Sequence, residues 1–102
     1  MNKLVRNDKV GVVYSPEFGA GWYTWNPNYP ELVFDPVIVE YVESKQMEKL
    51  EIYIRLKYPT VFIGALPHLI VEWVPQGDEF RITEYDGKES IELKRSTTWL
   101  IA

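Results

Sequence analysis

The sequence predicts an α+β domain in which an antiparallel sheet packs against two helices. Three observations support this class: short β-branched stretches towards both ends of the chain, helical apolar spacing in the middle, and an Asp86–Gly87 dipeptide typical of β-hairpins. The chain has 102 residues, which suffices for one hydrophobic core, and no repeat or flexible linker divides it. We therefore expect a single domain over residues 1–102.

The first expected strand covers residues 9–14, KVGVVY, because β-branched residues dominate this short run. Residues 14–30, YSPEFGAGWYTWNPNYP, then form a long aromatic loop rich in glycine and proline. This aromatic loop holds six aromatic residues, three prolines and two glycines, but its one charge is Glu17. So many prolines and glycines exclude a helix or a long strand. The aromatic loop is thus either a plug for the core or a rigid wall for a ligand.

Two helices are expected in the middle of the chain. Asp35 is a good N-cap, and a proline follows it at the first helical position, where a missing N–H costs nothing. The apolar spacing of this helix breaks at residues 43–46, ESKQ, and a second helix resumes at Met47. Ile52 and Leu56 widen the apolar surface of the second helix, so we expect it to contact two neighbours.

The rest of the chain is typical of strands. Residues 69–74, LIVEWV, end at a Pro- and Gly-containing turn, and residues 79–85 follow as the next strand. Asp86–Gly87 then predicts a two-residue hairpin loop, which sets Ile82 opposite Ile91.

The same hairpin register sets Arg81 opposite Glu92, so opposite charges meet on one face while apolar side chains meet on the other. Glu84 falls opposite Glu89 on the apolar face, where like charges cost stability unless solvent or a cation separates them. A last short strand is expected at 97–102.

Composition excludes several functional classes. With 15 acidic and 11 basic residues the net charge is −4, and no basic run offers a grip on a nucleic-acid polymer. The apolar stretches are far too short for a membrane span, and the N-terminal residues carry no secretory signal pattern. The absence of cysteine suits a reducing compartment. We therefore expect a cytoplasmic protein that binds neither nucleic acid nor membrane.

The chain also lacks a convincing catalytic constellation. His68 is the single histidine, and without cysteine it predicts no zinc site. Ser15 has no partners for nucleophilic attack. Glu84 and Glu89 are the one candidate acid–base pair, although a charge pair near a hairpin end is usually just solvated. We expect no enzyme, no catalytic residue, no metal and no cofactor.

The aromatic loop is the best candidate for a ligand site. In an extended segment Trp22 and Tyr23 point in opposite directions, so one large ring faces outwards, and Trp25 is our choice for that ring. A rigid aromatic ring can stack on a base, while neighbouring Thr and Asn side chains supply neutral donors and acceptors. The alternative is that these rings only fill the core. The expected ligand-binding residues are Ser15, Gly19, Ala20, Gly21, Trp22, Tyr23, Thr24, Trp25, Asn26 and Arg81.

The glycines around Ala20 allow backbone amides to approach a phosphate closely, and Arg81 or Arg6 would neutralise its charge. A dinucleotide fingerprint is not formed, since a third glycine, a lysine and a following helix are all missing. A tight turn between aromatic residues explains Gly19 and Gly21 equally well.

Residues 5–26, VRNDKVGVVYSPEFGAGWYTWN, resemble a family of small proteins common in tailed-phage genomes. The resemblance continues through residues 31–44, ELVFDPVIVEYVES, and residues 81–91, RITEYDGKESI, so it covers most of the chain. Phages carry many short proteins directed against host immunity. One class consists of small cytosolic proteins that sequester nucleotide or ADP-ribose signals of bacterial defence systems. The resemblance thus implies a counter-defence role, with no binding residue transferred from that class.

Two functions remain open at this point. The first is a non-catalytic binder that sequesters a nucleotide-derived signal of the cyclic nucleotide or cyclic ADP-ribose type. Because one short chain offers little depth beyond its core, we expect a homo-oligomer, most simply a two-fold dimer, to enclose such a ligand. The second is a protein-binding inhibitor of a host defence protein, with the aromatic loop as its docking surface.

Overall fold

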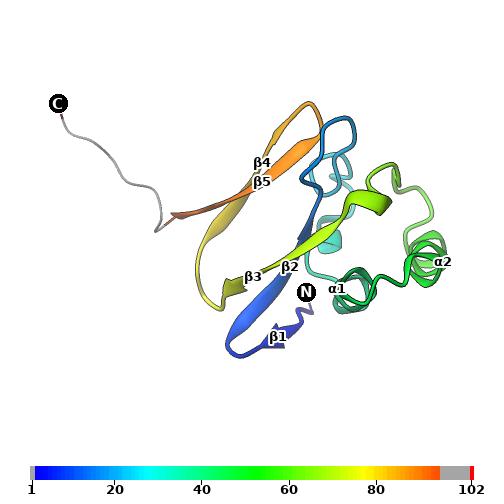
Figure 1. The fold of residues 1–102 in the computed structure, drawn as a ribbon, viewed down its shortest axis with the longest axis horizontal. Helices are drawn as coiled ribbons and strands as arrows, with labels where there is room; N and C mark the ends of the chain where they lie inside the picture. Colours follow the sequence, from blue (N-terminus) through cyan, green and yellow to red (C-terminus); the bar gives the residue numbers. More distant parts are fainter. Residues whose placement is uncertain (1, 95–101) are drawn as a thin grey trace.

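The α+β class is confirmed in the computed structural model, which describes residues 2–94 and 102 (Figure 1). The strand expected at 97–102 lies outside the described residues, apart from residue 102 itself. No helix of the described part is long and apolar enough to cross a membrane. The elements in chain order are β1 (Val5–Arg6), β2 (Lys9–Tyr14), the 3-10 helix η1 (Pro30–Val33), α1 (Pro36–Glu43), α2 (Met47–Lys57), the 3-10 helix η2 (Leu66–His68), β3 (Ile70–Pro75), β4 (Phe80–Tyr85) and β5 (Lys88–Leu93).

The described strands form two antiparallel sheets, one ordered β1-β2-β3 and the other made of β4 and β5. Helix α1 packs against one face of the first sheet at Gly11, where an added Cβ would lie 2.9 Å from Val39 Cγ1. The other face carries Val12 and Val74, which pack against Ile82 and other apolar residues of the β4–β5 hairpin. The molecule therefore has three layers, with the helices on one side of the three-stranded sheet and the hairpin on the other (Figure 1).

The hairpin register predicted from Asp86–Gly87 is confirmed. Ile82 pairs with Ile91, and Glu84 pairs with Glu89. Asp86 and Gly87 have φ of 49° and 85°, so both central turn residues are left-handed, as a type I′ turn requires. The alternation of side chains then follows: one face of the hairpin packs on the sheet and the other faces solvent.

Both helices begin where the sequence predicts, and α1 ends at the predicted break. The Asp35 Oδ1 atom accepts a hydrogen bond from the Val37 N–H at 2.9 Å, which caps α1. Lys45 has a φ of 58°, and this left-handed residue separates α1 from α2. Ile52 and Leu56 are both exposed, so no described element covers that side of α2. The expectation of a second neighbour within the chain was wrong at these two residues.

Asp35 also joins the two helices. Its Oδ2 atom accepts hydrogen bonds from Tyr58 Oη at 2.6 Å and Tyr53 Oη at 2.8 Å, and Lys57 Nζ lies 3.3 Å away. Burial alone would raise the pKa of Asp35, but these hydrogen bonds, the one from the Val37 N–H and the charge of Lys57 outweigh it and lower the pKa. Burial and the bond to Asp35 raise the pKa of Tyr58. The capping carboxylate thus remains charged and fixes the end of α2.

Candidate functional site

The first half of the aromatic loop folds around one buried carboxylate, Glu89 of β5, which is only 1% exposed. Its Oε1 atom accepts a hydrogen bond from the Ser15 N–H at 2.9 Å. Its Oε2 atom accepts from the Trp22 N–H at 3.1 Å, the Thr24 N–H at 2.7 Å and Thr24 Oγ1 at 2.7 Å. In return the Glu89 N–H donates to the Ser15 carbonyl at 2.7 Å. Four donors therefore compensate the cost of burying this charge.

The opposing carboxylate, Glu84, is exposed and has donors of its own. It accepts a hydrogen bond from the Gly87 N–H at 2.7 Å and from Trp25 Nε1 at 3.4 Å. The two like charges that the sequence places opposite each other are thus both satisfied by amide, hydroxyl or indole donors rather than by a cation. This use of Glu84 and Glu89 is structural.

The hairpin turn is held by the aromatic loop through close backbone contact. The Gly19 N–H donates to the Asp86 carbonyl at 2.6 Å. A Cβ atom at Gly87 would collide with the backbone nitrogen of Ala20 and would lie 2.9 Å from Gly19. Gly87 is therefore required twice, once for its positive φ and once for this contact. The Gly19 amide is occupied by the turn in this conformation.

The two tryptophans of the aromatic loop face differently. Trp22 is fully buried in the main core, where its Nε1 atom donates to the Leu32 carbonyl at 3.3 Å. Trp25 is 38% exposed, and its ring centroid lies 5.4 Å from that of Phe62. A Cβ atom at Gly21 would lie 2.5 Å from Trp25 Cδ1, so this glycine allows the ring to lie close to the backbone. The same loop therefore supplies both a core plug and an exposed ring.

The polar side chains expected to bind a ligand hold the loop together. Asn26 is buried, and its side chain exchanges hydrogen bonds with the backbone of Phe62, with Phe62 N to Oδ1 at 2.7 Å and Nδ2 to Phe62 O at 3.2 Å. Asn26 Nδ2 also donates to the Trp22 carbonyl at 2.8 Å. Ser15 Oγ donates to the Ala20 carbonyl at 2.9 Å. These contacts make the loop rigid.

Arg81 lies apart from the other expected ligand residues. It makes two hydrogen bonds to Glu92, at 2.9 and 3.1 Å, on the face of the hairpin opposite to Glu84 and Glu89. Arg6 pairs with Glu43, the last residue of α1. Tyr23 is half-buried against the second core formed by Val12, Val33 and Val74. The structure thus brings nine of the ten expected residues together and leaves Arg81 on another face.

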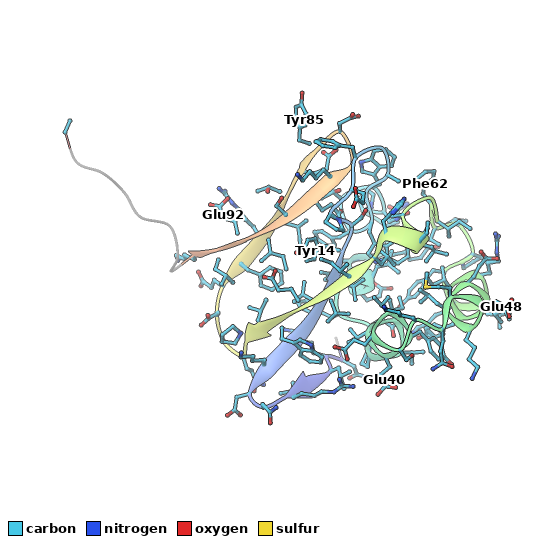
Figure 2. All side chains as sticks on the ribbon, in the orientation of Figure 1. Tyr14, Glu40, Glu48, Phe62, Tyr85 and Glu92 are labelled. Carbon is cyan, nitrogen blue, oxygen red and sulfur yellow. The ribbon has the colours of Figure 1, made fainter. Side chains whose placement is uncertain are left out.

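Three exposed aromatic residues were missed by the sequence reasoning. Phe18 and Tyr85 pack edge to face, with ring centroids 6.3 Å apart, and Lys88 Nζ lies 5.1 Å from the Phe18 centroid. Phe62 comes from a segment without a recognisable pattern and packs on Trp25. Figure 2 places Tyr85 and Phe62 at the same end of the molecule, away from Glu40. We call Phe18, Trp25, Phe62 and Tyr85 the aromatic surface; these side chains are 38% to 77% exposed.

The aromatic surface consists of two ring pairs on either side of the hairpin tip. Trp25 donates a hydrogen bond to Glu84 on the face of the hairpin that packs on the sheet (the inner face), while Phe18 packs on Tyr85, whose side chain belongs to the opposite, outer face.

Among the described residues, no group of three or more histidine, aspartate or glutamate side chains could hold a metal ion.

Comparison with known proteins gives no relative: no family model matches the chain, and no curated protein or solved structure is significantly similar to it. Function therefore has to follow from the site itself.

Proposed function

We propose that this protein is a non-catalytic binding protein whose aromatic surface docks onto a partner protein. The observation that carries the proposal is the exposure of four aromatic rings around the hairpin tip. Phe18 and Trp25 lie on the aromatic loop, which Glu89 and the hairpin turn hold in place. Tyr85 of β4 packs on Phe18, and Phe62 from the segment after α2 packs on Trp25. Tryptophan and tyrosine are enriched among residues that dominate binding energy at protein interfaces.

Rigidity supports this function. Trp25 is held by Phe62 and Glu84, and Phe18 is held by Tyr85 and Lys88. Rings that are ordered before binding lose little conformational entropy in the complex. Charges of both signs, Lys88 and Glu84, lie beside the rings, as at the polar rim of a protein interface.

The second candidate function is sequestration of a nucleotide-derived signal, and Trp25 is the observation that favours it. Its ring is exposed and fixed, as a ring that stacks on a base has to be. The cation expected to neutralise a phosphate is poorly placed for this function, because Arg81 pairs with Glu92 on the outer face of the hairpin. For this reason we rank protein docking first.

The resemblance to small phage proteins suggests where the partner would be found. The proposal is that the protein acts in the cytoplasm of a bacterial host as a counter-defence protein, with a host defence protein as its partner. We also propose that the chain self-associates, and the exposed Ile52 and Leu56 of α2 supply apolar area for it.

The test compares captured material from a bacterial lysate. The baits are the parent protein, a Trp25→Ala/Tyr85→Ala variant, and a Val37→Ala control that trims an exposed residue of α1. Protein docking predicts that the parent and the control retain one common protein and that the double variant loses it. A nucleotide released intact by heating the parent complex would instead support the second candidate. If all three baits retain the same material, the aromatic surface is not the binding site.

A further inference from the structure

A groove of about 510 Å³ lies where the end of α1, the start of α2, η2 and the start of β3 meet. The buried side chains Val42, Leu66 and Leu69 line it, together with the exposed Met47 and Ile70. The groove is thus mostly apolar and partly open, and it does not involve the aromatic surface. An apolar concavity of this size accommodates one or two aliphatic side chains of a ligand.

The groove borders an open strand edge. Strand β3 is one of the two outer strands of the three-stranded sheet, and no described strand pairs with its second edge (Figure 1). Ile70 and Val71 belong to both this strand and the groove. An edge strand presents a row of unpaired N–H and C=O groups that can accept one more strand. A strand added here would place alternate side chains over the groove.

Charge at the groove indicates what such a strand would carry. Two charged residues line it, Glu43 and Lys45. The Glu43 carboxylate already accepts hydrogen bonds from Arg6 and from Trp73 Nε1. Lys45 stands at the junction of the two helices, where its N–H donates to the Val42 carbonyl at 3.2 Å. Its side-chain ammonium makes no hydrogen bond or ion pair with the described residues. The complementary ligand therefore carries a carboxylate next to its aliphatic residues.

A second copy of β3 fits this edge poorly. In an antiparallel pair of two identical β3 strands, one register with a five-residue overlap sets Glu72 directly opposite its copy, where like charges repel. The other five-residue register and the full six-residue register both place Pro75, which has no N–H, in the ladder. A segment of a different chain avoids both problems.

We propose that the free edge of β3 binds an extended peptide segment of a partner protein by strand addition, with an aliphatic side chain in the groove and a carboxylate on Lys45. This binding site is separate from the aromatic surface, and its test does not depend on the function proposed above.

The probe is an acetylated heptapeptide of alternating threonine and valine that ends in aspartate. We expect saturable binding to the full chain, with NMR shift changes at the amides of β3 and at Met47. Two further versions of the peptide carry N-methyl groups, one at its odd-numbered residues and the other at its even-numbered residues. In an added strand only every second N–H group donates to β3. Strand addition therefore predicts that one of the two methylated peptides no longer binds and that the other binds as the unmethylated peptide does.

Charge reversal tests the carboxylate contact. Lys45→Glu should weaken binding about fivefold, the upper range for an exposed ion pair, whereas Lys49→Glu, the same change outside the groove, should leave it unchanged. Three results would overturn the proposal: no binding at millimolar peptide, equal binding of both N-methylated peptides, or shift changes centred on Trp25 rather than on β3. If Lys45→Glu and Lys49→Glu weaken binding equally, the proposed contact between the peptide carboxylate and Lys45 is wrong.

Discussion

At the scale of single residues, the buried carboxylate of Glu89 organises the aromatic loop. It accepts four hydrogen bonds, at 2.7 to 3.1 Å, from Ser15, Trp22 and Thr24. A carboxylate accepts at both of its oxygens, whereas an amide has one accepting and one donating end. The charge and the symmetry of this side chain are both required at the site.

We predict that Glu89→Gln lowers the free energy of unfolding by about 2–3 kcal/mol, because an amide donor then faces backbone donors of the loop. Glu84→Gln is the matched control. Glu84 is exposed and accepts hydrogen bonds from the Gly87 N–H and from Trp25 Nε1. Its replacement should therefore lower the free energy of unfolding by less than about 1 kcal/mol. Urea unfolding of both variants measures the difference. Equal losses would mean that the loop does not depend on Glu89.

Sequence reasoning found the two glutamates but not their role. Side-chain alternation placed Glu84 and Glu89 on the apolar face of the hairpin, and this was confirmed. The donors of Glu89 come from residues 65 to 74 positions away in the chain. Contacts over such distances follow from tertiary packing, and no local spacing encodes them. Phe62 was missed for the same reason, since only its packing on Trp25 makes it part of a surface.

At the scale of elements, the hairpin turn is a contact point as well as a turn. We predict that Gly87→Ala destabilises the protein by roughly 2–5 kcal/mol, combining the cost of an L-residue at positive φ with a collision against the loop backbone. Gly77→Ala is the matched control, because Gly77 has a similar φ of 90° and open space around its Cβ position. It should cost about 1–2 kcal/mol. Thermal unfolding that ranks the two variants equally would rule out the loop contact.

The junction of α1 and α2 predicts a pH dependence. The folded pKa of Asp35 lies below its ordinary value of 3.8, so the folded state binds fewer protons than the unfolded state. The stability contributed by this charge is complete above the unfolded value and is lost as the pH falls through the folded one. We expect Asp35→Asn to have a lower free energy of unfolding than the parent at neutral pH, and we expect this difference to become smaller in acid. Urea unfolding at a series of pH values measures it. A difference that stays constant from pH 7 into the acid range would contradict this account.

Local patterns predicted the elements better than their arrangement. The Asp35 cap, the break before Met47 and the Asp86–Gly87 turn each depend on a few neighbouring residues, and all three were confirmed. The short strand β1 was not predicted, since two residues carry no periodicity. The division into two sheets also lay beyond the sequence, because side-chain alternation does not tell which strands pair across a core.

At the scale of the whole molecule, self-association is expected through apolar surface that the described chain leaves open. We predict that light scattering at micromolar concentration gives about twice the 12.0 kDa mass of one chain. Replacing both Ile52 and Leu56 by glutamine should return it to the mass of one chain, because these exposed α2 residues supply the apolar contact. A single 12.0 kDa species of the parent protein would contradict the dimer.

The three-layer arrangement also explains why the aromatic loop divides its rings between two roles. The helical layer and the three-stranded sheet bury Trp22, while the hairpin layer ends beside Trp25 and holds it at the surface. The central claim is therefore that one rigid segment closes the core with one tryptophan and presents the other for binding.

Unfolding of Trp22→Ala and Trp25→Ala side by side tests this claim most directly. Trp22→Ala should lower the free energy of unfolding by about 3–5 kcal/mol, as removal of a fully buried tryptophan does. Trp25→Ala should lower it by no more than about 1 kcal/mol, because its ring is partly exposed and packs mainly on Phe62. If both variants unfold far below the parent, the aromatic loop belongs entirely to the core, and Trp25 is not a binding ring.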